Sequence, residues 1–362
     1  TISKGYRAST SFSFINPIKD RTNLTIITKS ITKKLLFEST KCIGLEYING
    51  KNIHKVYAER EVLVCGGAIN SPQILQLSGI GKGDYIKKWG LDVIADLPGV
   101  GENLQDHLDV LAHYECTQPV TEAKYTAGGL AFVRMAGILA QWLLTKKGAG
   151  NDIGLSGVSF LKTDDTLDLP DIQMHFIGSL LKDHGKTRPD SHAFSNHVCM
   201  LRPESRGYIA LKSLDPNVQP IIQPNYFATQ KDRDTLIKGV KISREIMNQP
   251  AFDEFRGKEI NPGDHIQTDQ EIEEFIRNNG ETIYHPVGTC KMGNDEFSVV
   301  DDKLRVRGIE NLRVVDASVM PTLIGGNTNA PTIMIAEKIS DHILGNDFLS
   351  PQTVNYKNKT AA

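Results

Sequence analysis

The residues best suited to chemistry in this chain of 362 residues lie in segment 284–293, where His285 stands between Tyr284 and Pro286. Proline disfavours helical geometry in the residue before it, so His285 is expected on extended backbone. An unperturbed histidine has a pKa near ~6.5, which suits a general base at neutral pH. For a histidine taken alone, a packed or surface role is the simpler interpretation.

A second segment, residues 322–338, combines Gly325 and Gly326 with a helix predicted at about residues 330–344. Two glycines allow a backbone to approach a flat ligand closely. Asn329 is suited to the N-cap position and Pro331 to the first turn. Because a helix N-terminus presents unpaired N–H groups and partial positive charge, this segment is expected to stabilise an anion.

Residues 61–81 predict a buried strand, a double-glycine turn and a short helix over residues 73–77. Ser71 would cap that helix and Pro72 would occupy its first position. A strand, a glycine turn and a helix N-terminus together favour anion binding, with a pyrophosphate as one candidate. Strand-to-helix packing without a ligand explains the pattern equally well, because such units occur in many folds.

Two further polar residues stand where a ligand could be contacted. Asp316 ends a predicted strand, where its carboxylate can accept hydrogen bonds from a ligand hydroxyl. Residues 97–107 contain G-x-G but lack the third glycine of a dinucleotide fingerprint, so a loop is expected there. His107 at its end is either catalytic or a hydrogen-bonded structural residue beside Asp106, and the structural role is favoured.

The elements that must position these residues follow two patterns. Near the N-terminus, a β-rich run at 23–28 and strands at 34–38 and 44–48 precede Asn49 and Gly50, a pair typical of hairpin turns. From about residue 110, alternating runs indicate an antiparallel sheet with one covered face. The runs assigned to it are 171–177, 197–201, 206–211 and 220–222, and helices are predicted at 232–247 and 269–278.

Composition argues against several kinds of partner and site. The chain is 40% hydrophobic and 23% charged, and its net charge of -2 gives no reason to expect nucleic acid. Its five cysteines lack a C-x-x-C pair, so free thiols are expected, without disulfides or zinc. Four histidines lack metal-ligand spacing and are expected to be structural or exposed, with no metal bound: His175, His184, His192 and His197.

No apolar run approaches the ~20 residues of a membrane-spanning helix. The most apolar segment, residues 135–144, is expected to be a core or interface helix, because its apolar residues surround the helix axis. Contact with a membrane surface is the alternative, given Trp142 and the following Lys146 and Lys147.

Taken together, the segments resemble the glucose–methanol–choline (GMC) family of FAD-dependent oxidoreductases. The resemblance rests on four blocks in the order of the family, residues 67–81, 97–107, 285–293 and 314–338. Within the family the chain is most similar to bacterial choline-dehydrogenase-like and aliphatic alcohol dehydrogenases, and block 201–207 adds to that likeness.

The resemblance implies an α+β fold with an incomplete FAD-binding α/β domain and an antiparallel-sheet substrate domain. The expected parts are a partial FAD-binding domain at 1–109, a substrate-binding domain at 110–284, a return to the FAD-binding domain at 285–346 and a flexible tail at 347–362. His285 matches the catalytic histidine of the family, and Asn327 matches the second active-site position, which holds His or Asn. Contacts with FAD are implied for Ile31, Gly67, Ala68, Asp316, Ala317, Asn329, Pro331 and Thr332.

The implied reaction is oxidation of a primary alcohol, aliphatic or choline-like, to an aldehyde by hydride transfer to FAD. Electrons are expected to pass to a quinone, with the protein in the cytoplasm at the inner face of the cell membrane and peripherally associated with it. Members of the family open with a strand, G-x-G-x-x-G and a helix, which this sequence lacks. The chain is therefore expected to be the C-terminal part of a longer enzyme. Three alternatives stay open: an inactive fragment or binding domain, an alcohol oxidase that uses O₂, and a hydroxynitrile lyase.

Overall fold

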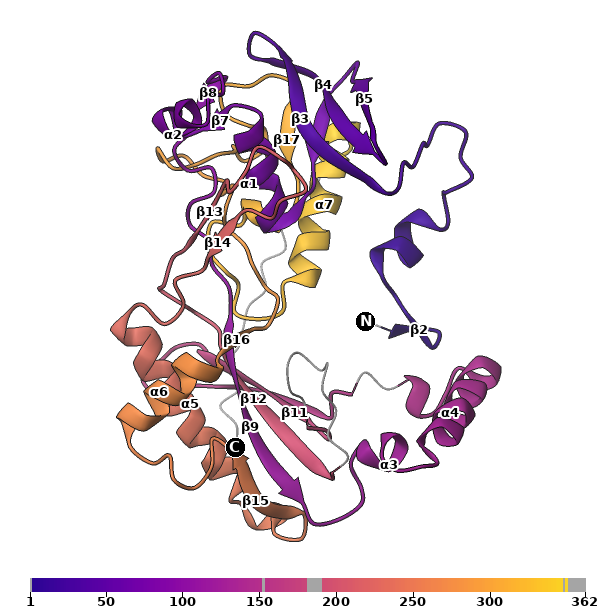
Figure 1. The fold of residues 1–362 in the computed structure, drawn as a ribbon, viewed down its shortest axis with the longest axis vertical. Helices are drawn as coiled ribbons and strands as arrows, with labels where there is room; N and C mark the ends of the chain where they lie inside the picture. The colour runs from indigo at the N-terminus through magenta and orange to yellow at the C-terminus, as the bar shows by residue number, and fades with distance from the viewer. Residues whose placement is uncertain (1, 152–153, 181–190, 348, 351–362) are drawn as a thin grey trace.

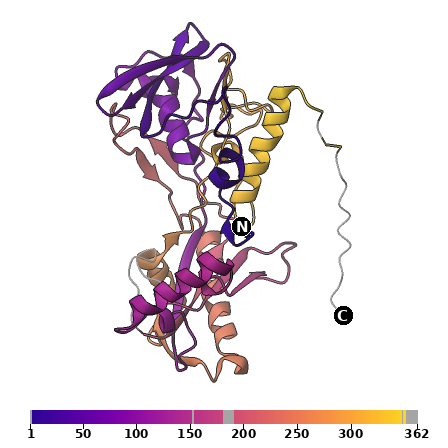
Figure 2. The same ribbon diagram turned by 90° about the vertical axis from the view of Figure 1, so that its right-hand side faces the viewer.

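The computed structural model describes residues 2–151, 154–180, 191–347 and 349–350. Helices and strands gather in two lobes along the long axis, with the short strand β16 (Glu281–Thr282) between them (Figure 1). The view turned by 90° shows the same two lobes, one above the other (Figure 2). Separate sheets and helices in one chain confirm the predicted α+β class. His184 and most of the predicted tail lie outside the described residues.

An antiparallel meander forms one side of the upper lobe, made of β3 (Ser30–Glu38), β4 (Lys41–Asn49) and β5 (Asn52–Tyr57). Gly50, at φ +62°, makes the predicted hairpin turn. The run at 23–28 is not a strand, which corrects the prediction. The Asn49 side chain donates to Thr28 O at 3.1 Å, so this carbonyl is satisfied by an amide instead of a neighbouring strand.

A parallel pair of strands, β6 (Val62–Val64) and β17 (Leu312–Val314), carries the loops of the candidate site. These apolar strands share a buried core with α1 (Gly67–Leu77) and α7 (Asn329–Leu344). Because parallel strands end at the same edge, the loops that follow β6 and β17 lie together. The lobe also contains β7 (Ile80–Gly81), α2 (Gly83–Lys88), β8 (Ala95–Asp96) and the 3-10 turn η5 (Ala317–Val319).

Helix α1 begins at Gly67, earlier than predicted, so Pro72 lies inside the helix and Ser71 is not its cap. Proline has no N–H to donate to the carbonyl four residues before it, which belongs to Ala68. The Thr289 hydroxyl supplies the missing donor at 2.6 Å from Ala68 O. A residue remote in sequence therefore completes the hydrogen bonding of this helix.

The lower lobe is built on an antiparallel sheet in the order β10 (Gly157–Leu161), β11 (Ile172–Ile177), β12 (Ala193–Met200), β9 (Leu108–Cys116) and β15 (Arg256–Asn261). Strand β9 also pairs with β16. Helices α5 (Gln230–Met247) and α6 (Asp269–Asn279) cover one face, where Ile172 and Val198 share a buried core with Leu236 and Ile276. The predicted sheet with a covered face is present.

Runs 206–211 and 220–222 do not belong to this sheet, which corrects their assignment. They form a separate hairpin of β13 (Tyr208–Ala210) and β14 (Ile221–Gln223). The hairpin packs in the upper lobe, where Gln76 on α1 donates to Ile209 O at 3.1 Å. A short alternating run shows that a strand has two faces, but it does not show which sheet the strand joins.

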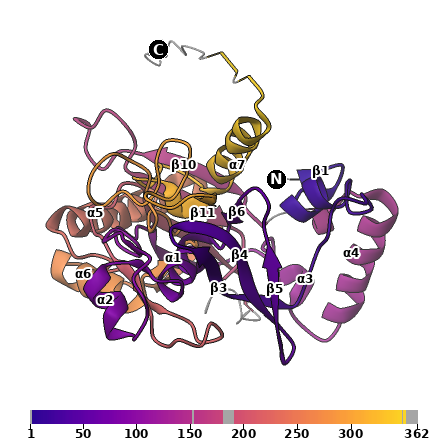
Figure 3. The ribbon, with the colours of Figure 1, turned by 90° about the horizontal axis from the view of Figure 1, so that it is seen from above.

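The N-terminal segment and helix α4 (Ala131–Thr145) lie together on one side of the molecule (Figure 3). Trp142 on α4 donates from Nε1 to Gly5 O at 2.9 Å. None of the residues of α4 is buried, which corrects the expectation of a core helix. None of the described helices is both long and apolar enough to span a membrane. The remaining short elements are β1 (Ile2–Ser3), β2 (Tyr6–Arg7), η1 (Ser11–Ile15), α3 (Ala123–Thr126), η2 (Ala149–Asn151) and η4 (Pro250–Phe252).

Candidate active site

Three loops that are distant in sequence meet between the lobes: residues 97–107, 284–293 and 321–327. Gln105 joins all three. Its backbone exchanges hydrogen bonds with Val287, and its side-chain Oε1 accepts the Leu323 N–H at 3.1 Å. Asn103 adds a second link, with Nδ2 3.1 Å from Gly288 O. Side-chain amides therefore join the loops in addition to one antiparallel backbone bridge between Gln105 and Val287.

Asp106 fixes the backbone of both buried histidines of the site. Its Oδ1 accepts the backbone N–H groups of His107 and His285, each at 2.9 Å. Its Oδ2 accepts the hydroxyls of Tyr226 and Thr282. A buried carboxylate with this many donors is a rigid anchor, because each donor would otherwise be left unsatisfied. Sequence analysis placed Asp106 beside His107 but did not predict this anchoring.

His285 and Asn327, the two predicted catalytic residues, come together at the site. Their side chains approach at 3.4 Å, from His285 Nε2 to Asn327 Nδ2. His285 is 9% exposed, whereas Asn327 is exposed. Gln173 on β11 donates from Nε2 to Asn327 Oδ1 at 3.3 Å, and so favours the orientation of the amide that turns Nδ2 toward His285.

Burial lowers the pKa of His285 below its ordinary value, and the negative charges of Asp106 and Asp109 oppose that shift without cancelling it. A histidine with a lowered pKa is neutral at pH 7. His285 therefore has a free lone pair on one ring nitrogen, which a general base requires.

His107 is completely buried, and its ring contacts His285 instead of Asp106. The two Nδ1 atoms are 3.0 Å apart. On its other side, His107 Nε2 lies 3.2 Å from Leu201 O and 3.1 Å from Ile324 O. Burial, followed by the charge of His285, lowers the pKa of His107 to about 4. The favoured structural role thus places His107 directly against the candidate base.

The uncovered face of the lower sheet turns polar side chains toward the site. On β11, alternation places His175 on the same face as Gln173, which contacts Asn327. On the paired strands, His197 contacts Asp109 at 2.5 Å. Burial opposes a charge on His197, but the charge and the hydrogen bond of Asp109 outweigh it and raise the pKa of His197. Sequence analysis missed Gln173 and Asp109, although the polar positions of the alternating run at 171–177 were a signal for the first.

Three of the predicted cofactor-binding residues lie where the loops after β6 and β17 meet. The Asp316 carboxylate accepts the Gly67 N–H at 2.9 Å, the Ser71 hydroxyl at 2.5 Å and the Ser318 N–H at 2.8 Å. Gly67, at φ +75°, has no heavy atom within 4 Å of the position that a Cβ would take. Ala68, by contrast, is buried. Asp316 therefore holds the two loops together beside an open glycine.

The other predicted cofactor-binding residues lie at the start of α7, in η5 and on β3. Helix α7 starts at Asn329, and its N-cap residue Thr328 makes no side-chain cap. The helix therefore begins with N–H groups that no cap side chain satisfies, close to the open position of Gly326. Pro331, Thr332 and Ala317 are half-buried, while Ile31 lines a separate cavity of about 330 Å³.

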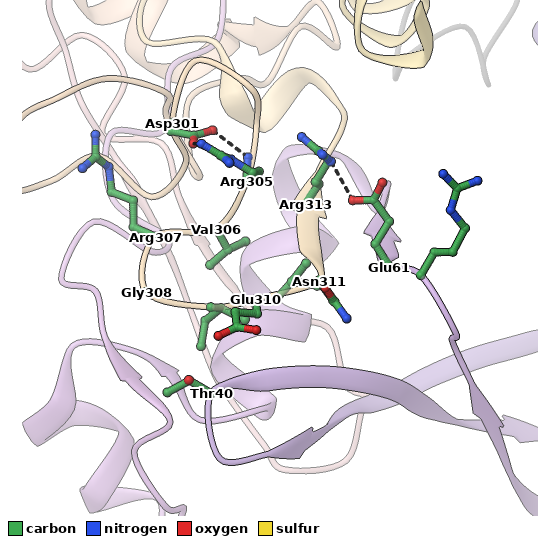
Figure 4. Close-up of a pocket in the computed structure, with 13 residues that line it drawn as sticks. Thr40, Glu61, Asp301, Arg305, Val306, Arg307, Gly308, Glu310, Asn311 and Arg313 are labelled. Atoms are coloured by element: carbon green, nitrogen blue, oxygen red, sulfur yellow. Dashed lines mark hydrogen bonds and ion pairs between the residues drawn. The ribbon is translucent and has the colours of Figure 1, made fainter. Parts of the chain in front are cut away.

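A cavity of about 880 Å³ lies apart from these residues, at the N-terminal ends of β6 and β17 (Figure 4). Four of its charged side chains form two ion pairs: Arg313 with Glu61 at 2.7 Å, and Arg305 with Asp301 at 2.6 Å. Neither His285 nor Asn327 lines this cavity. Ion pairs at a surface contribute little to stability and are common without any function. Because neither residue of the candidate pair lines the cavity, we assign it no catalytic role.

Comparison with known proteins gives two matches to family models, both described as GMC oxidoreductase. The N-terminal model matches residues 2–109 and the C-terminal model matches residues 203–336. The chain is 46% identical over 355 residues to an oxygen-dependent choline dehydrogenase of Cronobacter sakazakii, covering 98% of this chain and 63% of that protein. It is 44% identical over 365 residues to the mitochondrial choline dehydrogenase of Homo sapiens, covering 100% of this chain and 61% of that protein.

Solved structures give the same fold. Pyridoxine 4-oxidase from Mesorbium loti superposes with a TM-score of 0.82 at 27% identity, covering 96% of this chain and 64% of that one. A formate oxidase variant from Aspergillus oryzae RIB40, studied for FAD modification, superposes with a TM-score of 0.88 at 25% identity, covering 95% and 64%. The chain thus spans less than two thirds of the length of these relatives.

Proposed function

Because this chain belongs to the GMC oxidoreductase family, we propose that its protein oxidises a primary alcohol to an aldehyde with FAD as cofactor. Choline-like and aliphatic alcohols are the proposed substrates, in keeping with the choline dehydrogenases that the chain resembles. The observation that carries the proposal is the 3.4 Å approach of His285 Nε2 and Asn327 Nδ2, beside an open glycine and an uncapped helix end.

His285 is the proposed general base, and Asn327 is the proposed hydrogen-bond donor to the substrate oxygen. A hydroxyl between the two side chains would give its proton to Nε2 and accept a hydrogen bond from Nδ2. Both groups would hold the oxygen in one place while the α-carbon reacts. FAD, when bound, supplies the acceptor for the hydride.

The proposed FAD contacts fit the observed chain at two places. At the first, Gly67 leaves space that a larger residue would fill, and the Asp316 carboxylate accepts its N–H; Ala68 and Ala317 follow these two residues in sequence. At the second, the uncapped start of α7 offers N–H groups to an anionic group, near Asn329, Pro331 and Thr332. Ile31 is proposed to contact the adenine end. These contacts would place the cofactor in the upper lobe and the substrate against the polar face of the lower sheet.

We also propose a quinone as electron acceptor and peripheral binding at a membrane surface, because quinones dissolve in the bilayer. Helix α4 supports this proposal. Phe132 and Leu144 on it are 84% and 85% exposed, and no acidic residue occurs from 123 to 151, whereas Lys146 and Lys147 follow the helix. An apolar helix with basic neighbours suits a surface of anionic lipid.

The reaction is tested with the complete protein as its gene encodes it, loaded with FAD. Anaerobic addition of choline, or of a series of aliphatic primary alcohols, is expected to bleach the flavin absorbance, and a quinone analogue should restore it. Bleaching by none of these alcohols would contradict the proposed function. Aldehyde release from a cyanohydrin without bleaching would indicate a hydroxynitrile lyase, and rapid reoxidation by O₂ with peroxide release would indicate an oxidase.

Membrane binding is tested by sedimentation with vesicles. Vesicles rich in phosphatidylglycerol are expected to bind the protein more than vesicles of phosphatidylcholine, and Phe132→Ser with Leu144→Ser should weaken that binding. Ile53→Ser is the matched control, because Ile53 is also exposed but lies on β5. Equal binding by the control and the double variant would contradict a role for α4.

A further inference from the structure

The ring of His107 is surrounded by hydrogen-bonding groups whose roles are fixed. Its Nε2 faces two backbone carbonyls, Leu201 O at 3.2 Å and Ile324 O at 3.1 Å. Carbonyl oxygens only accept hydrogen bonds, so the nitrogen between them must carry a hydrogen. The proton on Nε2 of His107 is thereby assigned by its surroundings.

The other nitrogen of His107 must then be an acceptor. A neutral histidine carries one N–H, and this histidine stays neutral because burial lowers its pKa to about 4. Its Nδ1 lone pair points at His285 Nδ1, 3.0 Å away. Two acceptors cannot share a hydrogen bond, so the hydrogen must come from His285.

We infer that His107 holds His285 in the tautomer with a hydrogen on Nδ1 and none on Nε2, the atom at which the proposed base must accept a proton. The tautomer follows from the hydrogen bonds alone, whereas the role of His285 as a base rests on the proposed function. His107 would be a positioning residue, since it acts through His285 and does not reach the substrate.

The opposite tautomer of His285 would be penalised at both nitrogens. Its Nδ1 lone pair would face the Nδ1 lone pair of His107, and its Nε2–H would face the Asn327 Nδ2 donor. The first conflict would leave two lone pairs unsatisfied in a buried place, and the second would remove the hydrogen bond between His285 and Asn327. Gln173 donates to Oδ1, so a rotation of the Asn327 amide alone would lose that hydrogen bond.

The backbone keeps the two rings in this relation. Asp106 accepts the N–H groups of both histidines, and the rings meet edge to face at 88° with centroids 5.2 Å apart. The charged and titratable groups that act on the pair are Asp106, Asp109, His175 and Arg202. When His285 takes a proton on Nε2, its Nδ1–H can still donate to His107, now as a charged donor, which strengthens the bond.

The tautomer can be read directly, without turnover. Long-range ¹H–¹⁵N correlation spectra of the complete protein, labelled with ¹⁵N-histidine, distinguish protonated from lone-pair nitrogens, and His285→Ala identifies the signals of His285. We expect His285 with hydrogen on Nδ1 and His107 with hydrogen on Nε2 above pH 7. A hydrogen on Nε2 of His285 would overturn the inference, whatever the activity of the enzyme.

Two substitutions separate positioning from packing. In His107→Gln the amide can donate to the carbonyls and accept from His285, so the tautomer and most of the turnover should persist. In His107→Phe the ring shape remains without an acceptor, and we expect turnover to fall by roughly 10²-fold, as when a general base is lost. Equal turnover in both variants would contradict the inference. Failure of every alcohol to bleach the flavin, with the expected tautomer present, would refute the proposed function alone.

Discussion

The loops around His285 and the helix α4 differ in how their side chains are fixed by the rest of the molecule. Around His285, three loops without regular structure are held by side chains such as Gln105, Asn103 and Asp106, each bonded to backbone atoms of another loop. Helix α4 is regular over its whole length, yet it leaves Phe132 84% exposed. Regular structure is therefore no measure of how tightly a segment is fixed, because tertiary hydrogen bonds and packing decide that.

The sharpest test of the proposed role of the fixed region is His285→Ala. Removal of the proposed base is expected to lower turnover with an alcohol by roughly 10²-fold or more, while FAD stays bound. Steady-state kinetics with flavin absorbance as a loading check would measure this. His54→Ala is the control, since His54 lies exposed on β5. Near-normal turnover by His285→Ala would remove that residue from the mechanism.

Asp106→Asn tests the anchor that holds both histidines. The amide turns one acceptor oxygen into a donor, so at least one of four donors loses its partner in a buried place. We expect a loss of about 2 kcal/mol or more, measured as a lower Tm. Asp302→Asn is the exposed counterpart and should leave Tm unchanged. If both variants melt alike, the anchor contributes no stability.

The pH dependence of activity tests the same region, because the proposed base must be neutral to act. The pKa of His285 lies below the ordinary value of 6.5, so the neutral base is present at pH 7 and is lost only as pH falls below that value. The value of kcat/KM should stay level from pH 8 to 6.5 and then drop about tenfold per pH unit below the pKa of His285. Because the pKa of buried His107 is about 4, the unfolded chain binds protons first, and stability also falls from pH 6.5 toward 4. Unfolding must therefore be followed in parallel, and a decline that begins above pH 7 would contradict the lowered pKa of His285.

Gln173→Leu tests a single contact. Leucine has a similar size but cannot donate to Asn327 Oδ1, so the amide would be free to turn. The expected loss is about tenfold in turnover, the equivalent of one hydrogen bond of ~1.4 kcal/mol. Gln249→Leu, at an exposed position on the lower lobe, serves as the control. Unchanged kinetics would mean that Asn327 is oriented by other groups.

The smallest effect is expected on α4. Phe132→Ser removes an exposed side chain and should change the free energy of unfolding by no more than about 0.5 kcal/mol. Leu236→Ala, on the buried face of α5, should cost about 2–5 kcal/mol in a urea titration of both variants. A large loss in Phe132→Ser would show that α4 is packed against something in the complete protein, and would remove it as a lipid contact.

Much of the fold could be predicted from local pattern. Alternation at 171–177 gave both a strand and its polar face, and the boundaries of α5 and α6 lie within two residues of the predicted ones. The errors at residues 23–28 and at Pro72 share one cause, which is a partner from elsewhere in the chain. Thr289 allows α1 to pass through Pro72, and the Asn49 side chain satisfies Thr28 in place of a strand. No local pattern contains such partners.

For the candidate site, too, the identities of residues could be predicted, but their contacts across separate elements could not. Four blocks in the order of the family, residues 67–81, 97–107, 285–293 and 314–338, were sufficient for sequence alone to indicate a flavoenzyme family by resemblance, and with it a base at His285. The contacts of His107 with His285 and of Gln173 with Asn327 were not predicted, because each joins residues on separate elements. The roles of His285 and Asn327 stay predictions, to be decided by the experiments above.

By itself, then, the sequence determined which residues can take part and what each is able to donate or accept, because these are properties of side chains and their immediate neighbours. Only the tertiary structure decided which nitrogen of His285 is left free, since that depends on two carbonyls and a second imidazole brought together from three parts of the chain. Protonation is set by the whole surroundings of a group, and those surroundings exist only after folding.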